Sequence, residues 1–169
     1  LSELTDEEQE SLYKMIGLGA LKYFILKVDP KKRMLFDPKE SVDFNGNTGP
    51  FIQYAHARIQ SILKRVAVKD TLNEVSLDLL GQEDIETIKK IHDFPSILEE
   101  AGATKSPAII ANYIYDLVKT FNHFYQNTPP IVREENEALQ QFRLLICAKT
   151  GELVKNAMNL LGIDVPEQM

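Results

Sequence analysis

The sequence predicts an all-α fold, an antiparallel helical bundle with one long loop. Apolar residues recur at helical spacing in several long stretches, whereas β-branched residues nowhere alternate with polar ones for long enough to form a strand. The 169 residues are 44% hydrophobic and 26% charged, which is ordinary globular composition and sufficient for one domain with a real core.

The first helix is expected to begin just after Thr5. Thr5 and Glu8 have the spacing of a capping box, in which each side chain accepts a hydrogen bond from an amide that the helix leaves unpaired. The helical pattern is expected to be interrupted at Gly17 and Gly19, because glycine is unfavourable within helices. It then resumes and stops before Pro30, where a polar connector begins.

The second long helix is expected to follow the turn-rich segment 45–50. Its Asn-Gly pair commonly forms a β-hairpin turn, but a helical pattern follows, so we predict a compact loop with Pro50 in the first turn of a helix. The same spacing places Phe51, Tyr54 and Arg58 on neighbouring turns. The residues expected to face the core are Ile52, Ala55, Ile59, Ile62, Leu63 and Val66.

Two short helices are expected in the middle of the chain, one from about Glu83 to His92 and one that begins at Pro95. Ser106 and Pro107 then open a longer helix, which ends at the Pro-rich segment 127–130. Its core-facing residues are expected to be Ile110, Tyr113, Ile114, Leu117, Phe121 and Phe124.

The final helix is expected to run from near Glu134 to Leu161, with Gly162 as its stop. The single cysteine, Cys147, falls on the apolar side of this helix, so we expect a buried and unreactive thiol. The core-facing residues are expected to be Leu139, Phe142, Leu145, Ile146, Leu153 and Leu160.

Several features predict a cytoplasmic protein. No stretch approaches the roughly 18 apolar residues of a membrane span, and the N-terminus is acidic where a signal peptide is basic. A single cysteine cannot form an internal disulfide, which is typical of a reducing compartment. The chain begins at Leu1 without an initiator methionine, so we expect it to be a segment of a longer protein.

The distribution of charge is more informative than its sum. The net charge of −6 argues against a nucleic-acid partner, since such domains are usually basic. Residues 51–69, however, contain no acidic residue and include Arg58, Lys64, Arg65 and Lys69. A basic strip on an acidic body can steer a polyanion to one face, although an exposed helix surface with uneven charge explains the same pattern.

The sequence carries no motif for self-contained catalysis. His56, His92 and His123 fall on separate predicted helices, and none lies in an H-E-x-x-H or E-x-x-H pattern that would hold a metal. Gly17 and Gly19 follow no predicted strand, so they do not form a dinucleotide loop, and no phosphate-binding G-x-x-x-x-G-K motif is present. No nucleophile–base arrangement supports a small hydrolase.

Five segments carry a resemblance to a known family, namely residues 17–23, 44–58, 113–117, 121–125 and 160–169. The most specific matches are the Gly- and Asn-rich loop that runs into Gln-Tyr-Ala-His-Ala-Arg at residues 53–58, and the ending Pro-Glu-Gln-Met. Together these segments resemble the C-terminal part of arginyl-tRNA synthetases over nearly the whole chain. The match implies that Met169 is the natural C-terminus and that Leu1 is a cut.

The resemblance implies that residues 29–169 form the helical anticodon-binding domain of a class I aminoacyl-tRNA synthetase. Residues 1–28 correspond to a helical connector from an upstream catalytic domain, whose HIGH-like and KMSK-like motifs do not occur here. The implied parent is an arginine–tRNA ligase that uses ATP with Mg and arginine, while the segment itself is expected to hold no cofactor. The implied partners are arginine tRNA and the catalytic domain of the same chain, in a monomer without membrane contact.

The resemblance also implies which residues contact tRNA. In the family, the loop that lies against the anticodon loop corresponds to Asp43, Phe44, Asn45, Gly46, Asn47 and Thr48. Phe51, Tyr54 and Arg58 match two aromatic residues and an arginine of the next helix, Tyr125 matches a tyrosine at the end of a later helix, and Met169 matches the C-terminal methionine. Two positions depart from the pattern, since relatives more often have Tyr at Phe51, and some have Trp near Pro129.

The chemistry of these residue types agrees with the implied function. Proteins read unpaired bases by stacking them on aromatic rings, as Tyr54 and Tyr125 could do, and by hydrogen bonding to base edges. Arg58, Lys64 and Arg65 are suited to phosphates. The carboxylate of Met169 could accept a hydrogen bond from the middle cytosine that all arginine anticodons share.

Other interpretations of the same residues stay open. The chain could be a helical protein–protein interaction module whose amphipathic faces bind a partner helix. Tyr54 and Arg58 could form an intramolecular pair, and Tyr125 could be a half-buried residue at a helix end. Residues 45–49 could form only a structural turn, and Met169 could be a frayed end.

Overall fold

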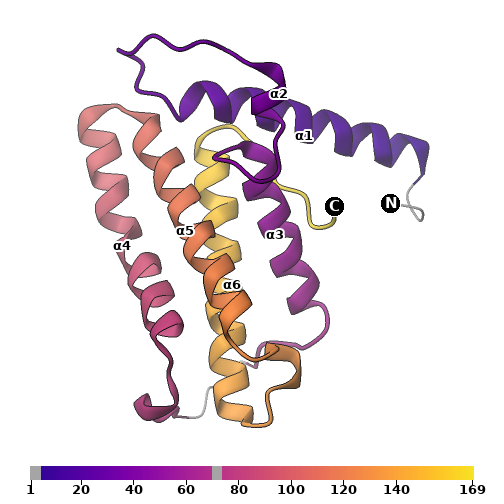
Figure 1. Ribbon diagram of the computed structural model, residues 1–169, viewed down its shortest axis with the longest axis vertical. Coiled ribbons are helices and arrows are strands. Elements are labelled where there is room, and N and C mark those ends of the chain that lie inside the picture. The colour runs from indigo at the N-terminus through magenta and orange to yellow at the C-terminus, as the bar shows by residue number, and fades with distance from the viewer. Residues whose placement is uncertain (1–4, 70–73) are drawn as a thin grey trace.

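The computed structural model describes residues 5–69 and 74–169, and in this part of the chain it contains helices and loops but no strand (Figure 1). The all-α prediction is therefore confirmed. The α-helices are α1 (Asp6–Leu26), α2 (Pro38–Ser41), α3 (Gly49–Leu63), α4 (Gln82–Thr104), α5 (Pro107–Asn127) and α6 (Glu137–Leu160), with 3₁₀ turns η1 (Leu77–Leu79) and η2 (Ile131–Arg133).

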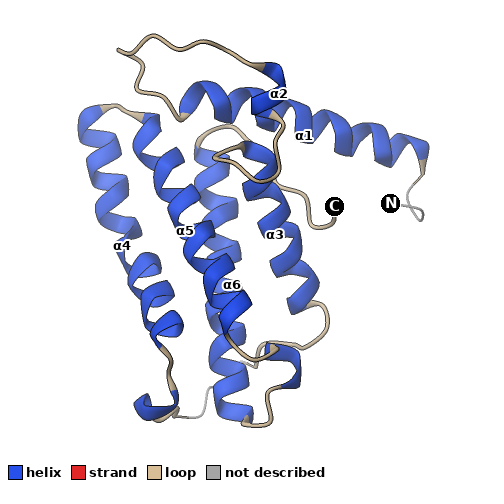
Figure 2. Cartoon of the chain, viewed as in Figure 1, coloured by secondary structure: helices blue, strands red, loops and turns tan. Residues whose placement is uncertain are grey.

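Helices α3, α4, α5 and α6 lie side by side and alternate in direction, as an antiparallel bundle requires (Figure 1). Helix α1 crosses one end of this bundle and packs on α3 and α5. Figure 2 shows that the connection from α1 to α3 loops out over the same end, and that the chain returns there after α6. The end of the bundle at α1 therefore gathers the loop 43–48, the start of α3 and the C-terminal residues.

The core consists of two clusters stacked along the bundle axis. The cluster nearer α1 includes Tyr23, Ile52 and Leu117, and the other includes Ile59 and Phe121. The predicted apolar stripe of α5 is confirmed from Tyr113 to Phe124, while Ile110 is only half-buried. Because Tyr23 is fully buried in the first cluster, the second half of α1 is part of the bundle core. The domain boundary expected at residue 28 stays a prediction.

The first helix begins as predicted but runs without a break through both glycines. The Thr5–Glu8 capping box is present, and its hydrogen bond to the Thr5 amide lowers the pKa of the Glu8 carboxyl. The expected interruption at Gly17 and Gly19 is wrong. A Cβ atom on Gly49 would lie 2.6 Å from the carbonyl oxygen of Gly19, so Gly49 lets α3 approach α1 closely at Gly19. The benefit of this contact outweighs the low helix propensity of glycine.

The two short helices expected in the middle are one helix, α4, with Pro95 inside it. A proline in a helix interior removes one backbone hydrogen bond, and packing must compensate for this loss. Here Phe94 stacks on Tyr113 of α5 at a centroid distance of 5.6 Å, and the Tyr113 hydroxyl donates to the carbonyl of Lys90. The contact with α5 thus holds both halves of α4 in one helix.

The inward face of α6 differs from the prediction. Leu160 is 60% exposed and Leu153 is only half-buried, whereas Leu144, Val154 and Met158 are fully buried. The helix ends as expected, because Gly162 has a φ of 69° and the amide of the next residue donates to the Met158 carbonyl. The error arose because α6 also turns polar residues inward, so apolar spacing alone did not define its buried face. The buried polar residues of α6 are Gln141, Arg143 and Thr150.

Arg143 is the centre of a buried ion cluster. Its Nε and Nη2 atoms donate to the two carboxylate oxygens of Asp84 at 3.0 and 3.2 Å, and Nη1 donates to Glu134 at 3.1 Å. Asp84 is fully buried and also accepts from the amide of Gly81 at the start of α4. A bidentate pair of this kind fixes the register of α4 against α6.

In the described residues, no helix is both long and apolar enough to cross a membrane.

Candidate nucleic-acid interface

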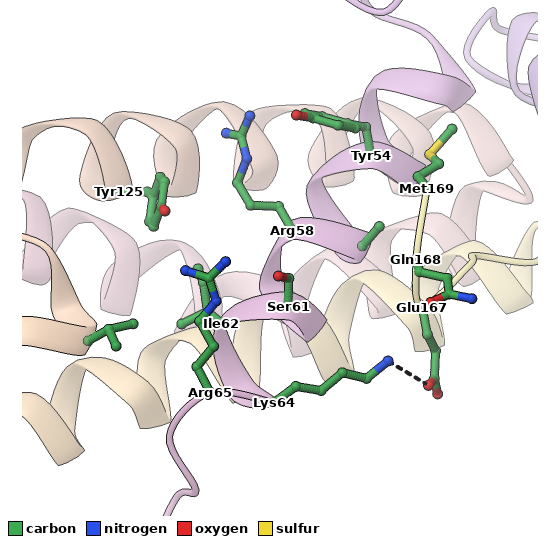
Figure 3. Close-up of a pocket in the computed structure, with 12 residues that line it drawn as sticks. Tyr54, Arg58, Ser61, Ile62, Lys64, Arg65, Tyr125, Glu167, Gln168 and Met169 are labelled. Atoms are coloured by element: carbon green, nitrogen blue, oxygen red, sulfur yellow. Dashed lines mark ion pairs between the residues drawn. The ribbon is translucent and has the colours of Figure 1, made fainter. Parts of the chain in front are cut away.

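Two tyrosines and an arginine lie in a row along the seam between α3 and α5 (Figure 3). The guanidinium of Arg58 lies over the Tyr54 ring, 4.9 Å from its centroid, and over the Tyr125 ring at 5.6 Å. It also donates to the side-chain oxygen of Asn122 at 3.2 Å. Tyr54 and Tyr125 are 44% and 38% exposed, so each ring keeps part of its surface open to a ligand. We name these three residues the Tyr–Arg–Tyr row.

The C-terminal segment, residues 162–169, lies on the other side of α3. It is extended and belongs to no sheet, so its backbone carbonyls need other partners. Side chains supply them at every second residue: the Gly162 carbonyl accepts from Lys22, the Asp164 carbonyl from Gln53 and the Pro166 carbonyl from His56. Between these points Ile163 packs into the core, together with the half-buried Val165.

The Tyr–Arg–Tyr row and the end of the C-terminal segment face each other across a groove of about 500 Å³ (Figure 3). The groove is bordered by both aromatic and basic side chains, which suits a ligand that carries rings and negative charge. Its lining residues are Tyr54, Ala57, Arg58, Ser61, Ile62, Lys64, Arg65, Tyr125, Val132, Glu167, Gln168 and Met169.

The basic strip expected along residues 51–69 is only partly realised. Lys64 and Arg65 are exposed at the groove, but Lys64 pairs with Glu167 at 3.8 Å. Lys69 pairs with Glu137 and does not line the groove, and this contact lowers the pKa of the Glu137 carboxyl. The positive charge at the groove therefore comes from Arg58, Lys64 and Arg65.

A second, apolar hollow of about 580 Å³ adjoins the groove. The two hollows share Tyr54 and Met169, which therefore form the wall between them. Helix α1 and the loop 43–48 both contribute side chains to the apolar hollow. Its lining residues are Leu12, Tyr13, Ile16, Phe44, Asn45, Tyr54 and Met169.

The loop 43–48 divides into an exposed part and an anchored part. Asp43, Phe44 and Asn45 are exposed, with the Phe44 ring edge-on to Tyr54 at 6.5 Å, and Gly46 is half-buried. Thr48 is buried and caps α3, because its hydroxyl oxygen accepts from the amide of Phe51. The structure thus places Thr48 away from the exposed surface that its predicted RNA contact requires.

Asn47 is likewise directed toward the bundle. Its side chain lies 2.6 Å from the hydroxyl of Tyr23, and its backbone carbonyl accepts from Lys27 at 2.9 Å. The Tyr23 hydroxyl is also 2.8 Å from the carbonyl of Ala111, and burial raises the pKa of Tyr23 well above its ordinary value. These contacts fix the loop to α1 and α5.

Phe51 is outside both hollows. Its ring packs against Tyr115 of α5 at a centroid distance of 5.6 Å, and the residue is half-buried against the first core cluster. It lies on the same seam as the Tyr–Arg–Tyr row, but the structure does not bring it to the groove. Of the predicted site residues, the groove therefore unites Tyr54, Arg58, Lys64, Arg65, Tyr125 and Met169, and the apolar hollow adds Phe44 and Asn45.

Sequence reasoning missed several residues of the site. Tyr13 of α1 lies in no motif, and Asn122 of α5 lies in the matching segment 121–125 but was assigned no role, because only the packing of α1 and α5 against α3 brings them there. Glu167 and Gln168 belong to the C-terminal motif, which provided a signal that was used only for Met169.

The described residues do not form a cluster of three or more His, Cys, Asp or Glu that could hold a metal ion. Cys147 is buried as predicted, and burial raises the pKa of its thiol to about 12, so it stays protonated and unreactive. The site thus offers aromatic surfaces, cations and hydrogen-bonding groups.

Comparison with known proteins agrees with this arrangement. Residues 52–169 match the family described as the DALR anticodon binding domain. An arginine–tRNA ligase of Parabacteroides distasonis is 52% identical over the whole chain, and one of Phocaeicola vulgatus is 54% identical. The arginyl-tRNA synthetase of Thermus thermophilus superposes with a TM-score of 0.87 at 29% identity over 99% of the chain. The chain spans only 28–29% of the length of these three proteins.

Proposed function

The chain belongs to the DALR anticodon-binding domain family, and from this premise we propose that it binds the anticodon loop and stem of arginine tRNA as the C-terminal part of an arginine–tRNA ligase. A catalytic domain elsewhere in the same protein would use ATP with Mg and arginine to charge the tRNA. The domain described here would supply no catalytic group and no cofactor site. Its task would be to position the tRNA, in a monomeric, cytoplasmic enzyme.

The observation that carries this proposal is the Tyr–Arg–Tyr row beside the groove. An anticodon loop presents unstacked bases with phosphates between them, and the row presents two exposed rings with a guanidinium between them. Stacking a base on such a ring contributes about 1–3 kcal/mol. The three cations of the groove suit the phosphates, and Lys64 would exchange its exposed pairing with Glu167 for a phosphate at little cost, because exposed ion pairs are weak.

Base edges would be read by groups at the wall between the two hollows. Met169 lies at this wall, where its main-chain oxygen can accept a hydrogen bond from the amino group of a cytosine. All arginine anticodons share a cytosine in the middle position, which makes it the expected target. The exposed Asp43, Phe44 and Asn45 would contact the RNA from the opposite side, while Asn47 and Thr48 hold this loop in place.

The proposal is tested by titrating the chain with arginine tRNA, with a variant changed at the middle anticodon base, and with an unrelated tRNA. Each titration is repeated at low and at physiological salt. We expect tight binding of arginine tRNA that survives physiological salt and weakens with the variant, because base reading depends less on salt than phosphate contacts do. Equal and salt-sensitive binding of all three RNAs would contradict the proposal and favour a helical protein-interaction module.

A further inference from the structure

The C-terminal segment brings Met169 to the groove, and a small number of side chains determine where it lies. Backbone hydrogen bonds to α6 hold only its first two residues, Gly162 and Ile163, and its carbonyls at residues 162, 164 and 166 accept from side chains of α1 and α3. Two of these donors, Gln53 and His56, are buried. The pair between Lys64 and Glu167 is exposed on both sides and contributes little. The contact nearest to Met169 that is also buried is that of His56.

The hydrogen bonds of His56 define its protonation state. A carbonyl oxygen only accepts, so the Nδ1 atom must carry the proton that it donates to Pro166 over 2.8 Å. The Nε2 atom lies 3.3 Å from the side-chain nitrogen of Gln60, which donates to it if Nε2 carries no proton. The neutral Nδ1–H tautomer therefore satisfies both neighbours. A second proton, on Nε2, would face the Gln60 nitrogen, while Nδ1 would still donate to Pro166.

We propose that His56 is a positioning residue of the RNA-binding site: in its neutral form it docks the C-terminal segment on α3, and this docking places Met169 at the wall between the groove and the apolar hollow. The effect on RNA binding rests on the proposed function, whereas the docking itself does not.

The charged groups around His56 come from two elements. Lys155 of α6 opposes its protonation, and Glu167 of the C-terminal segment favours it. Burial is the largest influence and lowers the pKa of His56 from its ordinary value of 6.5, while the hydrogen bond to Pro166 acts in the opposite direction. His56 is therefore neutral at neutral pH, in the form whose Nδ1 donates to Pro166 and whose Nε2 accepts from Gln60.

The docking is measured by following the methyl signal of Met169 in NMR spectra of the chain at pH 7.5. His56→Ala removes the donor, while His56→Asn keeps an amide nitrogen near the place of Nδ1. We expect the Met169 signal of the unchanged chain to differ from that of a free chain end. The His56→Asn variant should keep this docked signal, and the His56→Ala variant should give the free-chain signal.

Binding of arginine tRNA is measured on the same samples. His56→Ala should weaken it at least about tenfold at pH 7.5, as should removal of residues 167–169, and combining the two changes should weaken it no further. His56→Asn should bind as the unchanged chain does. An unmoved Met169 signal in His56→Ala would overturn the docking. A freed Met169 with unchanged tRNA binding would overturn its role in the site. If the unchanged chain does not bind tRNA at all, the proposed function fails, and the Met169 signal still decides whether His56 docks the segment.

Discussion

Replacing Asp84 by alanine should lower the free energy of unfolding by about 3–5 kcal/mol, because it leaves a buried guanidinium without its main partner. Both carboxylate oxygens of Asp84 bind Arg143, at 3.0 and 3.2 Å, and the carboxylate is fully buried. Glu134 remains at 3.1 Å from the guanidinium and keeps the loss toward the lower end of that range. The amide of Gly81 also loses its acceptor, which adds about 1 kcal/mol at a helix N-terminus.

Urea unfolding followed by circular dichroism measures this loss directly, and the slope of the transition should not change if both states keep their compactness. In a domain of this size, 1 kcal/mol lowers the melting temperature by about 2–4 °C, so we expect a fall of about 6–20 °C. Asp84→Asn is a useful companion variant, because its amide oxygen can still accept from Gly81 while the negative charge is lost.

A double variant separates the pair from its surroundings. Arg143→Met alone leaves Asp84 buried without its cation, but Asp84→Leu with Arg143→Met removes both charges together. Since attraction within a buried pair roughly offsets the cost of desolvating it, the double variant should be more stable than either single one. Single variants that cost less than about 1 kcal/mol, or that simply add in the double variant, would refute a coupled pair.

Gly49→Ala should destabilise the fold by about 1–3 kcal/mol, because its new Cβ would clash with the α1 backbone. Gly17→Ala should stabilise α1 by about 0.5–1 kcal/mol, since no atom lies within 4 Å of its new Cβ. Thermal unfolding of the two variants measures both effects. Tyr125→Ala should weaken tRNA binding by about 1–3 kcal/mol while circular dichroism shows that the chain stays folded. Tyr115→Ala, outside the groove, should leave the affinity unchanged in the same titration. Because burial lowers the pKa of His56, the unfolded chain takes up its proton first as the pH falls. The stability that neutral His56 provides is thus complete above about pH 6.5 and lost as the pH falls below it. Urea unfolding above and below this pH should show a loss of unfolding free energy in acid that is smaller in His56→Asn than in the unchanged chain.

The helices and most of the core followed from the sequence, because helical spacing and capping residues act locally. The Thr5 cap, the start of α3 at Pro50, the start of α5 at Pro107 and the Gly162 stop are all confirmed. The errors occur where a distant segment decides the local structure. Gly19 stays helical because it touches the start of α3, and α6 turns Arg143 inward because Asp84 comes from another helix.

The candidate site divides in the same way. Tyr54 and Arg58 share a helix face, so their proximity could be predicted from spacing, and the open possibility that they pair within the molecule is confirmed. The family resemblance supplied Tyr125 and Met169, and the groove does contain both. Spacing could not show that Arg58 lies against Tyr125 as well, that Thr48 is buried, or that α1 forms one side of an apolar hollow. Each of these facts depends on how the helices pack.

The hydrogen bonds that dock the C-terminal segment join residues 110, 111 and 140 positions apart in the chain. Contacts of such long sequence separation form late, since the chain between them must first be ordered. The groove is thus completed by residues that follow α6, after the bundle that supports it can already fold. A nascent or truncated chain that lacks residues 166–169 would present the Tyr–Arg–Tyr row without the wall at Met169. The bundle can therefore form before its groove is complete.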